Sequence, residues 1–116
     1  MPIIDLAKVA SAVEAYRPAE HKILSGAPDQ TVRNHYASAC GQFNVGEWTG
    51  AIGQWKVHYT EHEYCEILEG VSILRDESGE ARTVRKGDRF VVPAGFSGTW
   101  EVVEPCRKVY VIFEQA

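Results

Sequence analysis

Beyond residue 30, hydrophobic and polar residues alternate one by one along much of the chain. Between residues 55 and 59, Trp55, Val57 and Tyr59 alternate with Lys56 and His58, so one face of this segment is apolar and the other polar. Runs of this kind, separated by Gly, Asn, Asp and Pro, are spaced as in β-sandwiches and β-barrels. The pattern predicts strands at Thr31–Ala37, Glu47–Tyr59, Tyr64–Leu74, Phe90–Val92 with the preceding Thr83–Val84, and Gly98–Phe113 with a break near Pro105.

The end of the last predicted strand is apolar on both faces. Lys108 is the only charged residue between positions 108 and 113, and Tyr110 and Ile112 share its face. A strand of this kind is typical of a position that is covered on both sides. Between the strands, residues 86–88 predict a tight turn with glycine at positive φ, and residues 76–80 predict a hairpin loop.

The N-terminal segment has a different period. Apolar residues recur every three or four positions from Asp5 to Tyr16, which predicts a short amphipathic helix that covers an open end of the core. Asp5 is placed to cap its N-terminus, and Pro18 makes continuation unfavourable. We therefore expect an N-terminal helix and lead-in arm over residues 1–30, followed by a barrel over residues 31–116.

Composition and charge narrow the class of protein. The 116 residues are 45% hydrophobic and 24% charged, with a formal net charge of −4 and no basic block, so a nucleic-acid surface is not expected. No apolar run approaches the length of a membrane span, and no secretory leader is recognisable, so no membrane partner is expected. Three widely spaced cysteines fit a reducing cytoplasm better than a disulfide framework: Cys40, Cys65 and Cys106.

Two spaced motifs carry a family resemblance. Glu63 is followed after six residues by Gly70, and Gly87 is followed by Pro93 and Gly95 at the second motif's spacing. These spacings resemble the two motifs of the cupins. Four further segments resemble the small single-domain cupins grouped with ethanolamine-utilisation protein Q and the ureidoglycine-aminohydrolase cupins, namely Tyr59–Glu61, Ile67–Gly70, Gly98–Val102 and Glu104–Tyr110. The resemblance implies an all-β, RmlC-like jelly-roll barrel around a small-molecule pocket, in a homodimer that pairs or exchanges N-terminal strands.

The resemblance also implies a metal centre, but the expected ligands have changed. A typical cupin binds its divalent transition metal through two histidines and a glutamate in the first motif and one histidine in the second. In this sequence the two histidine positions of the first motif fall on Val57 and Tyr59. If the spacing to Glu63 is one residue longer, they fall on Lys56 and His58. The alternation of inward and outward residues along the strand favours Val57 and Tyr59. The fourth falls on Gly98 or Thr99. Of the four ligand positions, only Glu63 clearly keeps a metal-binding residue. No cofactor is therefore predicted. If a metal did bind, its candidate ligands would be His58 and Glu63.

The inward face predicts a pocket that combines opposite charges with phenols. We expect catalytic roles for Glu63, Lys108, Tyr59 and Tyr110, because a carboxylate, an ammonium and phenols inside an apolar barrel shift one another's pKa values. The same face adds Trp55, Cys65 and Trp100 to the substrate pocket. The ligand would be a small molecule, and an enzyme would act on a nitrogen-containing or carboxylated metabolite. Two alternatives stay open: a non-catalytic metabolite-binding or sensing module, and a filled barrel in which Glu63 and Lys108 form a structural ion pair.

Overall fold

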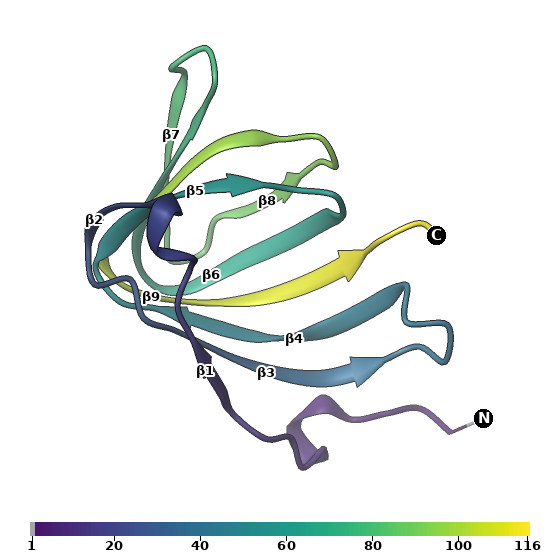
Figure 1. Cartoon of the computed structure of the whole chain (residues 1–116). Coiled ribbons are helices and arrows are strands. Elements are labelled where there is room, and N and C mark those ends of the chain that lie inside the picture. The colour runs from purple at the N-terminus through teal and green to yellow at the C-terminus, as the bar shows by residue number, and fades with distance from the viewer. Residues whose placement is uncertain (1) are drawn as a thin grey trace.

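The computed structural model of the protein describes residues 2–116, and two long antiparallel strands form its centre (Figure 1). Strand β6 (His62–Asp76) pairs with β9 (Ser97–Phe113) along nearly the whole length of both. On the other side of β9, its first half pairs with β5 (Gly53–His58) and its second half with β4 (Phe43–Gly50). Strand β9 therefore pairs with three other strands, β4, β5 and β6.

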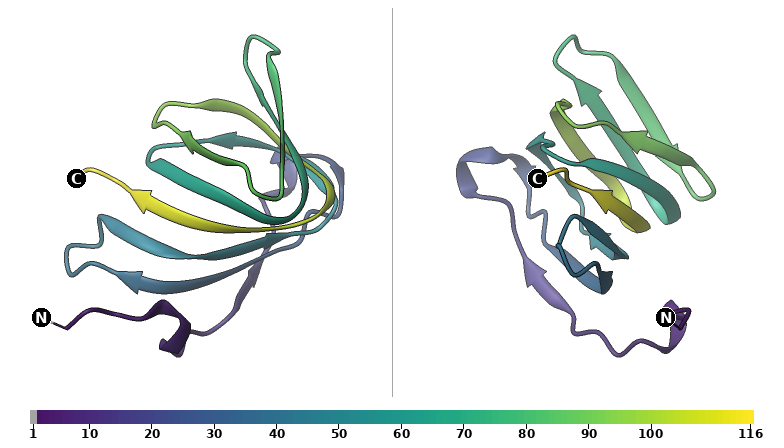
Figure 2. Two further views of the ribbon diagram at one scale, coloured as in Figure 1. Left: turned by 180° about the vertical axis from the view of Figure 1, so that it is seen from behind. Right: turned by 90° about the vertical axis from the view of Figure 1, so that its right-hand side faces the viewer.

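The remaining strands extend this centre to both sides, and the sheet curls on itself (Figure 2). One edge continues from β4 to β3 and β1, another from β5 to β2, and a third from β6 to both β7 and β8. These strands are β1 (Glu14–Tyr16), β2 (Ile23–Gly26), β3 (Gln30–Ala37), β7 (Ala81–Arg85) and β8 (Arg89–Val92). The prediction of an all-β fold is confirmed.

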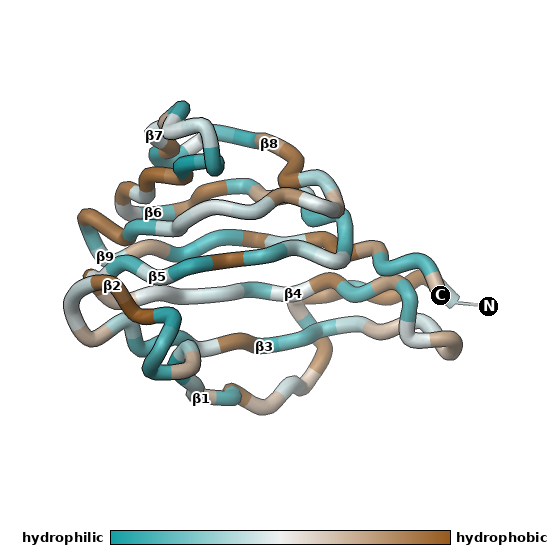
Figure 3. The backbone as a smooth tube through the Cα atoms, turned by 45° about the horizontal axis from the view of Figure 1, so that its top comes forward, coloured by the Kyte–Doolittle hydropathy of each residue, from teal (hydrophilic) through white to brown (hydrophobic). Residues whose placement is uncertain are grey.

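The core lies on the concave side of the curl. Hydrophobic and hydrophilic positions alternate along the long strands (Figure 3), so each strand turns every second side chain inward. On β9 the inward positions run from Trp100 to Tyr110 with unbroken parity. The buried apolar core consists of Trp48, Trp55, Cys65, Ile67, Leu74, Val84, Phe90, Val92, Trp100, Val102, Cys106 and Tyr110.

Two strand predictions need correction. The run predicted at Glu47–Tyr59 is two strands, β4 and β5, separated by a turn between Gly50 and Gly53. The break predicted near Pro105 does not end the strand, because β9 continues through this exposed proline, but Pro105 pairs with neither β4 nor β6. The register of β6 against β9 shifts on both sides of Gly70, which has a φ of +85°. Glycine adopts this conformation without the steric penalty of other residues.

The predicted N-terminal helix is wrong. Asp5 does accept a hydrogen bond from the Ala7 amide, but only one 3₁₀ turn follows, η1 (Leu6–Lys8), and residues 14–16 form β1 instead. The side chains of the expected apolar stripe stay exposed, including Leu6 and Val13. A short helix without a buried face is marginal in water, whereas strand pairing with the free edge of β3 satisfies the backbone.

The N-terminal segment then crosses the barrel. A second 3₁₀ turn, η2 (Glu20–Lys22), leads into β2, so β1 and β2 both pair with strands that follow residue 30. The division into an arm and a barrel at residue 30 stays a prediction. None of the helices formed by residues 2–116 has the length and apolar character needed to cross a membrane.

Candidate functional site

A cavity of about 360 Å³ opens on the concave side of the sheet. Strands β5, β6 and β9 supply half of its lining residues, and the segment from Tyr16 to Lys22 supplies one side of its mouth. The size is at the lower end of the range of small-molecule pockets. Its wall is rich in aromatic side chains, with Trp48, Trp55, Tyr59 and Trp100 among them.

A buried ion pair lies against this cavity. The Nζ atom of Lys108 on β9 is 3.2 Å from both carboxylate oxygens of Glu63 on β6. The side chains are only 5% and 7% exposed, respectively. Charges this far from water are stable only when they are paired, so each residue depends on the other. Both nevertheless line the cavity, where a ligand can reach them.

Two tryptophan rings complete the surroundings of the Lys108 ammonium. Its Nζ lies 4.1 Å from the ring centre of Trp100 and 4.7 Å from that of Trp48. The two rings meet edge to face, with their centres 5.5 Å apart. The negative face of an aromatic ring attracts a cation, most strongly where water is excluded. The ammonium is therefore stabilised by one carboxylate and two indole faces.

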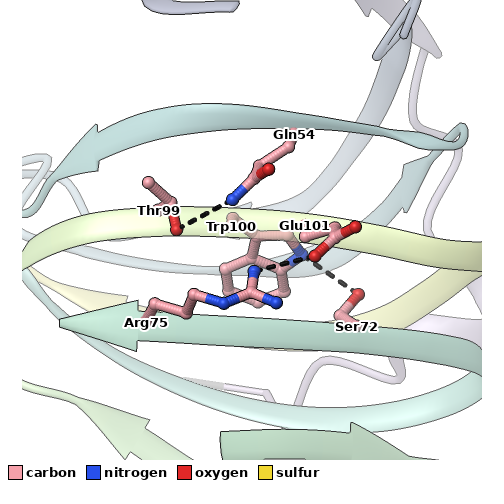
Figure 4. Close-up of polar contacts among 6 residues, drawn as sticks. All are labelled: Gln54, Ser72, Arg75, Thr99, Trp100 and Glu101. Atoms are coloured by element: carbon pink, nitrogen blue, oxygen red, sulfur yellow. Dashed lines mark hydrogen bonds and ion pairs between the residues drawn. The ribbon is translucent and has the colours of Figure 1, made fainter. Parts of the chain in front are cut away.

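Hydrogen bonds fix the orientation of both rings. The Trp48 indole N–H donates to Oε1 of Gln30 at 2.8 Å, and the Trp100 indole N–H donates to the hydroxyl of Ser72 at 3.1 Å. Figure 4 shows this Trp100 contact. Around it, outward-facing polar pairs join β9 to its neighbours, namely Gln54 with Thr99 on β5 and β9, and Arg75 with Glu101 on β6 and β9.

The site changes the ionisation of its groups. Burial by itself lowers the pKa of Lys108, but the charge and hydrogen bond of Glu63, together with Cys65 and Tyr16, outweigh it, and the pKa is raised. Burial, with the nearby Glu63 charge, raises the pKa of Tyr59 well above its usual value. At neutral pH, Lys108 is therefore an ammonium and Tyr59 a neutral phenol. Both present hydrogen-bond donors to the cavity.

The structure brings together most of the residues expected at the site. Tyr59, Glu63 and Lys108 line the cavity, as do Trp55 and Trp100. Their strands explain this placement, because β9 pairs with both β5 and β6, and Trp55, Glu63 and Lys108 are at buried positions of these strands.

Cys65 and Tyr110 are not part of the cavity lining. Cys65 is fully buried in the core, where burial raises its pKa to about 12. The Tyr110 hydroxyl donates to Oδ1 of Asn34 at 2.7 Å, toward β3. Its cross-strand partner is Gly46, and a side chain at that position would collide with the phenol, so the missing side chain leaves room for the Tyr110 ring.

The residues present do not fit a cupin metal centre. Val57 packs against the core, and the ring of His58 is exposed, with its Nδ1 hydrogen-bonded to the hydroxyl of Ser97. Glu63 is the one residue of the cupin ligand pattern that clearly remains, and both of its carboxylate oxygens face the Lys108 ammonium. Within residues 2–116 no three His, Cys, Asp or Glu side chains gather in a metal-binding group. A transition-metal site needs about three such ligands, so no step is assigned to a metal here.

Three residues of the cavity were not anticipated from the sequence. Gln30 is buried with its carboxamide bonded to Trp48, although it lies just outside the predicted strand at 31–37. Tyr16 and Lys22 reach the mouth from the segment that was expected to be helical or irregular. No local sequence signal marks any of them, because their placement depends on how the N-terminal segment pairs with β3 and β5.

The curled, nearly all-β half-barrel is the architecture of a cupin domain. The model of the EutQ-like cupin domain matches residues 37–110, so this chain belongs to that family. The chain matches none of the curated proteins with which it was compared.

Solved structures share the fold. A Pseudomonas syringae protein of unknown function from the DUF861 family has a TM-score of 0.80 at 22% identity, over 94% of this chain and 46% of that one. This chain therefore spans less than half of that protein's length. A predicted oxalate decarboxylase from Thermotoga maritima has a TM-score of 0.70 at 14% identity, over 98% and 100% of the two chains. A putative ethanolamine-utilisation protein Q from Salmonella typhimurium has a TM-score of 0.66 at 14% identity, over 94% and 99%.

Proposed function

We propose that the protein binds a small nitrogen-containing or carboxylated metabolite in this cavity, and that the Glu63–Lys108 pair contacts it. The observation that carries the proposal is a buried ion pair that opens onto a cavity of about 360 Å³. A packed barrel with a purely structural pair would leave no such space beside the charges. The cavity therefore favours a ligand site over a filled barrel.

As an enzyme, the protein would use its own side chains for proton transfer. Glu63 would accept a proton from the bound molecule, while the Lys108 ammonium would donate one to the atom that gains negative charge. The Tyr59 phenol would orient the molecule by donating a hydrogen bond. Tyr110, which is bonded to Asn34, would act only by positioning the wall behind the pair.

A non-catalytic binding module is the second candidate, and the electrostatics of Lys108 favour it. The pKa of this ammonium is raised, and one carboxylate and two indole faces hold it in place. A group stabilised in its charged form gives up its proton reluctantly. The same pocket would then recognise or carry a metabolite without changing it.

An unbiased ligand search tests the proposal. The purified protein is incubated with fractionated metabolite pools, and binding is followed by native mass spectrometry and by thermal shift. A ligand that binds the folded state must raise its melting temperature. We expect hits that are lost in a folded Glu63→Gln/Lys108→Met variant and kept in a Lys86→Met control, whose substitution lies in an exposed turn away from the cavity. Hits that persist in the double variant would contradict the role of the pair.

Conversion of the ligand separates the two candidates. If the hit is turned over, the reaction product accumulates with wild-type protein and not with the double variant. If the hit is recovered unchanged after prolonged incubation, the protein is a binding module.

We also propose a homodimer in the cytoplasm. Large apolar side chains of the N-terminal segment are exposed, Ile3 almost completely and Ile4 by 46%, and a second copy could cover them. All three cysteines are free thiols, which fits a reducing compartment. Light scattering at tens of micromolar, about the range in which a stable interface is populated, measures the mass. A monomer at that concentration would contradict the dimer.

A further inference from the structure

Two lysines without acidic partners lie at the mouth of the cavity. Strands β2 and β5 are antiparallel, and Ile23 pairs with Trp55. Lys56 follows Trp55 on β5, and Lys22, the last residue of η2, precedes Ile23. Both are exposed, both line the cavity, and neither forms an ion pair with any of residues 2–116.

The charge balance at the mouth leaves a place for an anion. Of the three lysines and two glutamates that line the cavity, Lys108 and Glu63 neutralise each other. Lys22 and Lys56 then oppose only Glu61, one of whose oxygens already accepts a hydrogen bond from Thr60. Like charges that line one small cavity repel each other, and an anion bound there would offset that repulsion.

Deeper in the cavity, a buried amide has a free donor. Gln30 is 5% exposed, and its Oε1 accepts from the Trp48 indole. Its Nε2 donates to no atom of residues 2–116, although the side chain lines the cavity. Among residues 2–116 no fully buried side-chain nitrogen or oxygen lacks a partner, so this Nε2 stays within reach of the cavity and is a candidate contact for an oxygen acceptor of the ligand.

We propose that the ligand is a carboxylate that carries a second, uncharged oxygen acceptor on a short apolar chain. The carboxylate lies at the mouth between Lys22 and Lys56, the chain crosses the face of Trp55, and the second oxygen accepts from Nε2 of Gln30. This inference rests on the proposed function, because it describes the molecule that the same cavity would hold. It adds two recognition elements that lie outside the Glu63–Lys108 pair.

Three small probes test the two recognition elements separately. They are 5-oxohexanoate, its uncharged primary amide, and hexanoate, which lacks the ketone oxygen. Ligands of this size bind with dissociation constants of about a millimolar, which NMR titration measures well. The indole N–H signals of Trp48, Trp55 and Trp100 are built-in reporters, because all three rings line the cavity.

The lysine variants test the carboxylate. We expect wild-type protein to bind 5-oxohexanoate about three- to tenfold more tightly than the amide, from two partly exposed charge contacts. This ratio should fall to about one in Lys22→Met/Lys56→Met, and should decline in wild type as salt is raised. It should be unchanged in Lys86→Met, which removes an exposed lysine elsewhere. Both substitutions of the double variant are at exposed positions, so the fold should survive.

A glutamine variant tests the second oxygen. Gln30→Glu keeps an acceptor for the Trp48 indole but loses the Nε2 donor. The ratio of 5-oxohexanoate to hexanoate affinity should exceed one in wild type and fall to one in the variant. Both probes are carboxylates, so the negative charge added by Gln30→Glu weakens the binding of both to the same extent. Its effect therefore cancels in the ratio of the two affinities.

The outcomes separate this inference from the proposed function. Equal binding of acid and amide, an acid preference that survives in Lys22→Met/Lys56→Met, or no binding of the acid would each overturn the carboxylate assignment. The proposed function is read independently from the metabolite hits and from their loss in Glu63→Gln/Lys108→Met. Those hits can persist while the carboxylate assignment fails.

Discussion

Removing both members of the Glu63–Lys108 pair should cost less stability than the sum of the two single losses. Lys108→Met leaves a carboxylate in a site where the Glu63 side chain is 7% exposed. Glu63→Gln leaves an ammonium that is 5% exposed but still lies over the faces of Trp48 and Trp100. The double variant places two uncharged side chains of similar length in the same space. The pair is therefore suited to a double-mutant cycle.

The expected free energies follow from this burial. Loss of one partner from a buried pair costs about 3–5 kcal/mol, and we expect Lys108→Met to lie in that range. Glu63→Gln should cost about 1–2 kcal/mol less, since each cation–π contact to the remaining ammonium contributes about 0.5–2 kcal/mol. The double variant should be no less stable than Lys108→Met. The coupling is then at least the loss in Glu63→Gln, about 1–4 kcal/mol, against about 0.5 kcal/mol for independent sites.

Urea denaturation followed by tryptophan fluorescence and circular dichroism measures the four free energies at pH 7. The pKa of Lys108 is raised above 10.5 in the folded protein, so its charge stabilises wild type fully below pH 10.5 and less as the pH rises through the folded value. Additive single losses would refute the assignment of a coupled buried pair.

Three further predictions concern backbone, thiols and metal. Gly70→Ala should lower the free energy of unfolding, measured by urea denaturation, by several kcal/mol, because the new Cβ would collide with the Pro105 carbonyl oxygen. Gly79 also has a positive φ but has open space around it, so Gly79→Ala should cost only about 1–2 kcal/mol. Equal losses would contradict the role of the close approach. At pH 7.5 a thiol reagent should modify Cys40 alone, since this thiol is exposed and a hydrogen bond from Ser38 lowers its pKa, whereas burial raises the pKa of Cys65 to about 12. Rapid modification of more than one thiol in the folded state would contradict this. Elemental analysis after dialysis against a chelator should find no stoichiometric transition metal, because Lys108 engages both oxygens of Glu63; one ion per chain that survives, and whose removal lowers the melting temperature, would show that the ligand set was misjudged.

The fold was predictable from the sequence because its signals are local. Alternation with period two marked the strands, and glycines marked turns such as residues 86–88. The segment from Asp5 to Tyr16 was misjudged because its three-residue spacing was read without its surroundings. The free edge of β3, formed by residues distant in the chain, decides its conformation.

The site was predictable in part for the same reason. The alternation of inward and outward positions was enough to predict that Trp55, Glu63 and Lys108 point inward, and these residues line the cavity. Parity does not give the register between strands, so it could not reveal that Gly46 faces Tyr110 and lets its hydroxyl reach β3. Nor could it reveal Gln30, because a single buried polar residue has no periodic signature.

The position of β9 in the chain has a consequence for biosynthesis. This strand pairs with β4, β5 and β6, yet it is synthesised after all three. At about 5–20 residues per second, the completed β4 waits roughly 3–13 seconds for its partner to be made. During this time its backbone groups face β3 on one side only, and unpaired strand edges promote association between chains. The nascent protein is therefore most vulnerable to aggregation just before its last strand emerges, and a chaperone that shields β4 and β6 in that interval should raise the yield of folded protein.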